Sequence, residues 1–145
     1  MILLFILSSI KVLGQSPNPD DSSTVNKLLD ESKSHLTSDT SKAIQLAREA
    51  MNLAQKIGYK KGEAYANKNL GMVYYMQARY VETQKYWNES LSLFQEIKDD
   101  IGTSNILNNI GAIYFAQGVD DKALEYCLKS LKYAEKTGDT LPLGS

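Results

Sequence analysis

The chain has 145 residues, a length typical of a single domain. Its 16 Lys and Arg residues nearly balance 17 Asp and Glu residues, so the net charge of −1 creates no overall field that would attract nucleic acid. One Cys and one His exclude a disulfide framework and a Cys/His zinc site built from one chain. With 43% hydrophobic residues and three prolines, the chain can instead bury a hydrophobic core.

The chain begins with an apolar stretch, MILLFILSSIKVLG. This stretch is shorter than the roughly 20 apolar residues that a membrane span needs, and its length suits a signal peptide. Val12 and Gly14 form a small-residue cleavage pattern before Gln15, although the usual basic start is missing. We expect a signal peptide at residues 1–14 and an exported, periplasmic protein; a buried N-terminal helix is the alternative. Residues 15–22, rich in Pro, Asn and Asp, are predicted to be a linker.

The rest of the chain repeats itself with a period of 40 residues. Shifting the sequence by this period places identical residues on one another without a gap, at Gly62/Gly102, Asn69/Asn109, Gly71/Gly111, Tyr74/Tyr114, Tyr86/Tyr126 and Leu91/Leu131. A fixed period in this range is typical of a solenoid, in which each unit packs on the next.

Apolar residues within each unit follow helical spacing. In the third unit Leu107, Ile110 and Tyr114 form one helical run, and a second run begins at Ala123 after a turn at Gly118. Each unit is therefore predicted to be a hairpin of two helices that buries its apolar face by stacking. The predicted array covers residues 23–138 in units of about 23–60, 61–100 and 101–138, and residues 139–145 are expected to be the tail of a truncated chain.

Two segments, Asn67–Leu91 and Leu107–Leu131, resemble the tetratricopeptide repeat (TPR). The pattern is carried in the third unit by Leu107, Ile110, Gly111, Tyr114, Gly118, Ala123, Cys127 and Ser130. The resemblance implies an all-α fold, a right-handed superhelical α-solenoid of three TPR hairpins. The usual repeat has about 34 residues, and the longer period here is similar to that of TPR arrays in bacterial sensor and regulatory proteins.

No nucleophile–base pair or glycine-rich phosphate loop is evident, so the sequence predicts neither an enzyme nor a cofactor or metal site. Cys127 takes an inner position of its repeat and is predicted to be a buried structural thiol. The aromatic residues that recur at repeat spacing are predicted to belong to the core, namely Tyr74, Tyr86, Tyr114 and Tyr126, together with Trp87.

In TPR arrays the first helix of each hairpin lines a concave face that binds a peptide. The resemblance places there Tyr65, Lys68, Asn69, Met72, Tyr75, Met76, Asn105, Asn108, Asn109, Ala112, Phe115 and Ala116. The amides of Asn69 and Asn109 are predicted either to hold a peptide backbone or to bond to the neighbouring helix. Only Lys68 in this set is basic, so we do not expect the carboxylate capture known from chaperone-binding TPR domains.

The sequence therefore predicts a non-catalytic module that binds a protein or peptide, as the extracytoplasmic sensing or scaffolding segment of a bacterial signalling protein. The alternatives are a free-standing exported scaffold protein and a small enzyme, for which a cluster of titratable residues is missing. We expect no nucleic-acid partner, and contact with a membrane only through a segment further along the protein. Leu124, Leu128 and Leu131 are expected to be partly uncovered, which favours truncation or self-association through the last repeat.

Overall fold

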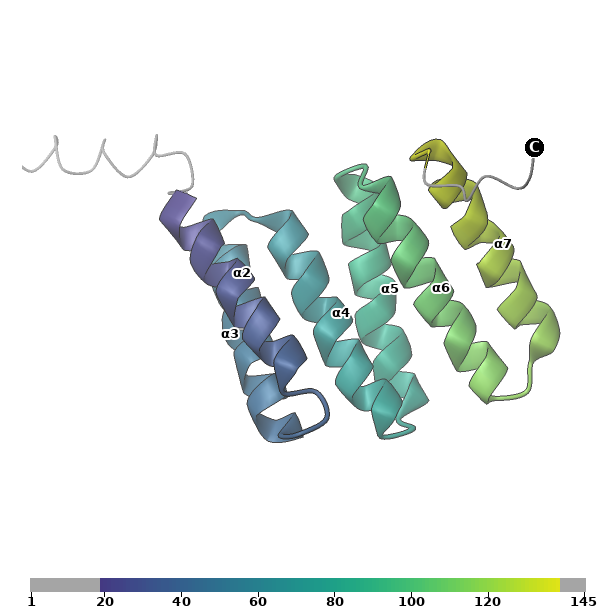
Figure 1. Ribbon diagram of the computed structural model, residues 1–145, viewed down its shortest axis with the longest axis horizontal. Helices are drawn as coiled ribbons and strands as arrows, with labels where there is room; N and C mark the ends of the chain where they lie inside the picture. The colour runs from purple at the N-terminus through teal and green to yellow at the C-terminus, as the bar shows by residue number, and fades with distance from the viewer. Residues whose placement is uncertain (1–18, 139–145) are drawn as a thin grey trace, which may run out of the picture.

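The computed structural model describes residues 19–138, and these form six helices joined by short turns (Figure 1). The helices are α2 (Pro19–Ser34), α3 (Thr40–Ile57), α4 (Lys60–Met76), α5 (Tyr80–Glu96), α6 (Asp100–Ala116) and α7 (Asp120–Lys136). Corresponding helices begin 40 residues apart, since α3, α5 and α7 start at Thr40, Tyr80 and Asp120. The prediction of an all-α solenoid is confirmed.

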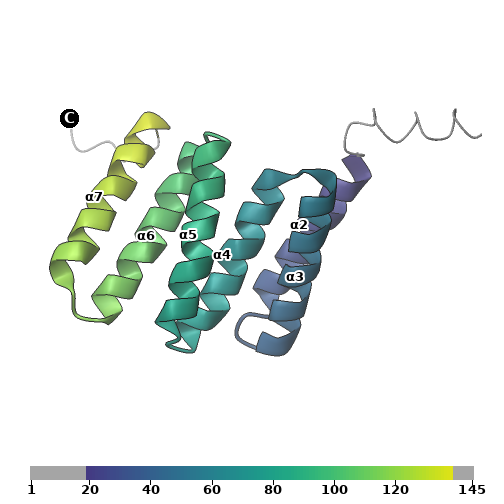
Figure 2. The ribbon, with the colours of Figure 1, turned by 180° about the vertical axis from the view of Figure 1, so that it is seen from behind.

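Each helix packs mainly on the helices before and after it, and α2 also touches α4. The tightest partners are the two helices of one hairpin, α2 with α3, α4 with α5, and α6 with α7. Figure 1 looks onto the first helices of the hairpins, α2, α4 and α6, and Figure 2 shows the opposite side with α3, α5 and α7. The first helices therefore share one face of the array.

The turns that follow α3, α4, α5 and α6, and the end of α7, each contain one residue in the left-handed backbone region. These residues recur at 20-residue intervals, as Gly58, Ala78, Lys98, Gly118 and Gly138. After the first four of them, the next N–H group donates to the carbonyl five residues back, as Val119 does to Tyr114 at 2.8 Å, which is the pattern of a Schellman cap. Glycine adopts this conformation freely. Ala78 and Lys98 carry side chains, so their φ angles of 57° and 56° strain the backbone.

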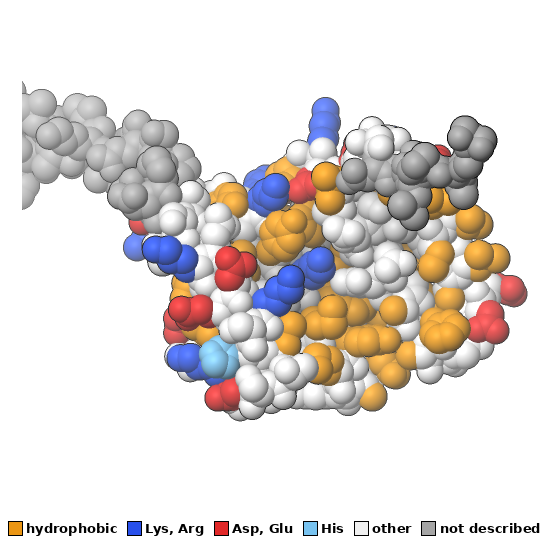
Figure 3. All heavy atoms as spheres, viewed as in Figure 1, with side chains coloured by type: hydrophobic (Ala, Val, Ile, Leu, Met, Phe, Trp, Pro, Cys, Tyr) orange, Lys and Arg blue, Asp and Glu red, His pale blue; other side chains and the backbone are white. Residues whose placement is uncertain are grey.

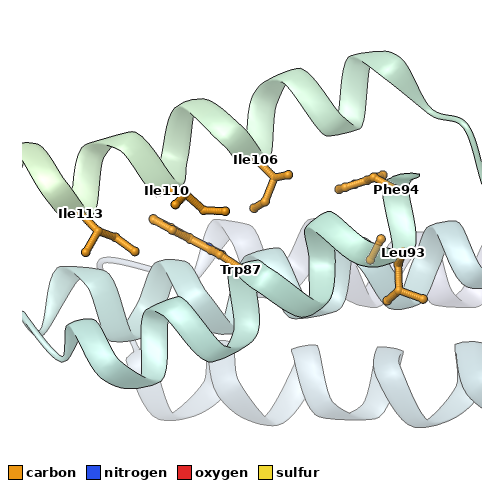
Figure 4. Packing of buried hydrophobic residues seen from close by; sticks show 7 residues of the cluster. Trp87, Leu93, Phe94, Ile106, Ile110 and Ile113 are labelled. Atoms are coloured by element: carbon orange, nitrogen blue, oxygen red, sulfur yellow. The ribbon is translucent and has the colours of Figure 1, made fainter. Parts of the chain in front are cut away.

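Trp87 and Phe94 form the centre of the core between the second and third hairpins. Both lie on α5 and pack against Ile106, Ile110 and Ile113 of α6 (Figure 4). Trp87 is only 1% exposed, although it is the largest side chain in the protein. The core between the first hairpin and α4 is made of smaller residues, Val25 and Leu29 of α2, Ala50 and Ala54 of α3, and Ala66 of α4.

One predicted boundary was wrong. Helix α2 begins at Pro19, so residues 19–22 of the predicted linker are helical. Proline is tolerated in the first turn because its missing N–H would have no intrahelical acceptor there. Residues 1–18 and 139–145, with the predicted signal peptide, the start of the linker and the tail, lie outside the described residues. No described helix is both long and apolar enough to cross a membrane.

Replacing Ala78 with glycine should stabilise the fold by about 1 kcal/mol, because the left-handed conformation would no longer strain a side chain. Gly118→Ala is the matched control. A Cβ there would meet nothing within 4 Å, so its expected loss of about 1 kcal/mol isolates the backbone effect. Urea unfolding measures the free energy of unfolding of both variants. A loss of stability in Ala78→Gly would contradict the claim that Ala78 strains the backbone.

Candidate functional site

A pocket of about 210 Å³ is lined by residues of α2, α4 and α6 and of the turn after α2. Its lining, which we call the groove pocket, consists of Lys33, Leu36, Tyr65, Lys68, Asn69, Met72 and Asn109. Five of the twelve predicted groove residues are among them. Figure 3 shows this face of the molecule, where basic side chains lie beside a run of hydrophobic side chains.

Helix α4 contributes the largest share of the groove pocket. Tyr65, Lys68, Asn69 and Met72 are spaced by three or four residues, so they lie on one side of the helix. Helix α4 buries Leu70 and other residues in the core. The ring of Tyr65 also makes an edge-to-face contact with Phe94, with ring centroids 5.1 Å apart, which fixes it between core and pocket.

Two lysines bring positive charge into the groove pocket. Burial lowers the pKa of Lys68, and the nearby charge of Lys33 lowers this pKa further. Across residues 19–138 the ion pairs involve other side chains, and none joins a carboxylate to Lys33 or Lys68. The pocket is therefore locally positive in a chain whose net charge is −1. The sequence did not predict Lys33, because Lys33 lies in the first unit, where the repeat pattern that located the groove residues of the other two units is absent.

The two repeat-related asparagines differ in their hydrogen bonds. Asn69 donates from Nδ2 to the carbonyl of Leu29 on α2, at 3.1 Å. Of the two predicted roles for Asn69, this bond corresponds to the one in which its amide binds the neighbouring helix. In contrast, Nδ2 of Asn109 is buried and has no hydrogen-bond partner among the described residues. A buried donor without an acceptor is costly, so Asn109 is the member of the pair that an external acceptor would satisfy.

The other predicted groove residues do not line the groove pocket. Tyr75 packs between Tyr80 and Trp87, with ring centroids 5.9 and 5.4 Å away. Met76 and Ala116 are exposed at the ends of their helices. The remaining four residues line other hollows. Asn105 lines one beside α7, and the crevice between α6 and α7 is lined by Asn108, Ala112 and Phe115. The structure thus divides the predicted set among separate surfaces.

The aromatic predictions hold for the most buried residues. Trp87 and Tyr74 are buried in the core, and Tyr74 stacks on Tyr86 with ring centroids 5.5 Å apart. Tyr114 and Tyr126 repeat this stack one unit later, at 5.3 Å, but are only half-buried. The stacked pairs join the two helices of the second hairpin and those of the third.

The prediction for Cys127 was wrong, since this thiol is exposed. Its repeat equivalent, Trp87, is covered by α6. Within the described residues no helix covers α7 in the same way. A repeat position is buried only where the next hairpin packs on it, and repeat spacing does not report that packing.

Alanine substitution should separate the two asparagines. Asn69→Ala should destabilise the fold by about 1 kcal/mol, because the bond to Leu29 is lost. Asn109→Ala should change stability by less than about 0.5 kcal/mol, because its Nδ2 has no bond to lose. Urea unfolding of both variants provides the comparison, and equal losses would show that Asn109 is bonded like Asn69.

Comparison with known proteins identifies the family. The family model described as tetratricopeptide repeat matches residues 62–136. A search of curated proteins finds no significant match. Among solved structures, the TPR domain of Arabidopsis FLU is similar with a TM-score of 0.70 and 22% identity, over 80% of this chain and 98% of that chain. That likeness concerns the fold. Two helical hairpins matched by the family model, within a solenoid of three, show that the chain belongs to the tetratricopeptide repeat family.

Proposed function

We propose that the chain is a non-catalytic module that binds a segment of a protein partner across α2, α4 and α6, with an acidic group of that segment in the groove pocket. One observation carries the proposal. The pocket combines the ammonium groups of Lys33 and Lys68 with the buried, unpaired amide of Asn109. These groups donate hydrogen bonds, and a carboxylate would accept from them and offset the repulsion between the lysines.

The apolar part of the groove pocket supports a peptide as the ligand. Tyr65 and Met72 line the pocket beside the lysines and are both partly exposed. An aromatic ring and a flexible thioether provide contact area that adapts to different side chains. A mixed surface of this kind suits a polypeptide better than a small inorganic anion, which would use only the donors.

Membership of the family supports a protein partner, since tetratricopeptide repeats generally bind other proteins. Two surface carboxylates have lowered pKa values. The lowered pKa of Glu82 is due mainly to a hydrogen bond from Arg79, and that of Glu125 to one from Lys129. Both pairs lie at the surface and away from the groove pocket. Each shift therefore has a local explanation that requires no active site.

Selection from a phage-displayed peptide library on the immobilised chain tests the proposal. We expect the selected peptides to be enriched in Asp and Glu, and Lys68→Met to weaken the best of them about tenfold, as measured by fluorescence anisotropy. Lys42→Met removes the same charge from an exposed position on α3 and is the control that should bind like the wild type. Amidated and free C-termini distinguish a side-chain carboxylate from a chain-terminal one.

Two results would contradict the proposal. One is selection of neutral peptides that Lys68→Met binds as tightly as the wild type does. The other is a pKa of Lys68, followed by NMR, that does not rise when the peptide binds. A carboxylate beside the ammonium group favours its charged form, so occupation of the groove pocket must raise this pKa.

We also propose that the protein acts outside the cytoplasm, as the sensing or scaffolding segment of a bacterial signalling protein. The support is the apolar stretch at residues 1–14 and the similarity of the 40-residue period to that of sensor arrays. Mass spectrometry of the protein from a periplasmic fraction should find Gln15 as its first residue. This part of the proposal would be contradicted if the protein were found only in the cytoplasm, with chains that still begin at Met1.

A further inference from the structure

Helix α7 exposes an apolar stripe that the groove proposal does not use. Leu124, Leu128 and Leu131 are 59%, 52% and 50% exposed. Together with the exposed Cys127 between them, they form what we call the α7 stripe. Phe115 at the end of α6 is 74% exposed and lies beside it, lining the same crevice as Leu124 and Cys127. Apolar side chains gathered in this way mark a contact surface.

A hollow of about 430 Å³ adjoins the α7 stripe, and Gly111 and Cys127 lie in its lining. In the preceding repeat Trp87 fills the corresponding space, since a Cβ on Gly71 would lie only 2.3 Å from its ring. A Cβ on Gly111 would instead be 3.6 Å from Sγ of Cys127. The smaller cysteine thus leaves room that bulky apolar side chains of a partner would fill.

The spacing of the α7 stripe is the same in both directions along the helix. Leu124 and Leu131 stand three residues outside the central pair, Cys127 and Leu128. A second α7 that runs antiparallel therefore presents Leu131 opposite Leu124, and Leu128 opposite Cys127. Such self-complementarity is what a two-fold symmetric interface requires.

The charges on α7 favour the same arrangement. The first half carries three acidic residues, Asp120, Asp121 and Glu125, and one basic residue, Lys122. The second half reverses this balance with Lys129, Lys132, Lys136 and Glu135. Antiparallel helices place each half against the half of opposite charge, and parallel helices would oppose like charges.

The other end of the array does not fit the α7 stripe. The exposed residues of α2 include Asn26, Lys27, Asp30 and Glu31, all polar or charged. Head-to-tail stacking would press these groups onto the leucines of α7 and leave them without water. A symmetric contact between two α7 helices avoids this cost.

We propose that the α7 stripe is a homodimer interface, in which a second copy of this chain packs its α7 antiparallel across a two-fold axis near Cys127 and Leu128. In the dimer, leucines of each copy enter the hollow beside Cys127 of the other. Glu125 of each copy lies near Lys132 of the other, on the same flank of the interface. The groove pocket remains open on both copies, because α7 contributes no residue to it; its lining comes from α2, the turn after α2, α4 and α6.

Sedimentation velocity of the purified chain under reducing conditions, from about 1 to 300 µM, tests the dimer. We expect a monomer–dimer equilibrium that Leu128→Glu weakens at least about 100-fold, because two carboxylates would then lie beside the two-fold axis in an apolar contact. Val81→Glu is the matched control. Val81 lies on α5 and, at 82%, is the most exposed large hydrophobic residue among those that the structure describes, so this variant should dimerise like the wild type.

Two further measurements fix the geometry. Glu125→Lys should weaken the dimer, and adding Lys132→Glu should restore it, since the exchange recreates the opposite-charge contact. A short bismaleimide should join two chains through Cys127, the single cysteine of the sequence. A chain that stays monomeric over the whole range, a dimer unaffected by Leu128→Glu, or a dimer that the reagent leaves uncoupled would overturn the proposal.

Discussion

The contact between Trp87 and Gly71 sets the geometry on which the rest of the array depends. The indole lies so close to Gly71 that a single methyl group on that residue would collide with it. Its Nε1 donates to the carbonyl of Lys68 at 3.0 Å, and its ring packs on the isoleucines of α6. One side chain therefore joins α4 to α5 within a hairpin and α5 to α6 between hairpins. Because each hairpin has too little apolar surface to be stable alone, this junction sets the position of α6.

The groove pocket is a consequence of that packing. Trp87 bonds to the backbone of Lys68, Phe94 holds the ring of Tyr65, and Asn69 is tied to the carbonyl of Leu29. The pocket residues of α4 are thus fixed from the core side and from α2, and they do not have to be ordered when a ligand arrives. A preformed surface loses less entropy on binding, which favours recognition of a flexible peptide segment.

Both candidate surfaces lie where the repeat departs from its own symmetry. Asn69 and Asn109 share a repeat position, yet only the first finds an acceptor on the neighbouring helix. Trp87 and Cys127 also share a position, and the exchange of an indole for a thiol opens the hollow beside α7. The regular positions maintain the solenoid, and the irregular ones leave polar or apolar groups available to a partner.

The amino-acid sequence by itself determined the helices, their hairpin order and the family, because helical periodicity and a repeat of fixed length are local properties of the chain. Its resemblance to the repeat also pointed to Lys68, Asn69 and Asn109, which line the groove pocket. Only the tertiary structure decided which of these residues meet. Lys33 reaches the groove pocket from a helix without groove markers, and Cys127 is exposed although its repeat equivalent is buried. Burial and charge pairing depend on neighbours distant in sequence, and these are fixed only when the hairpins stack.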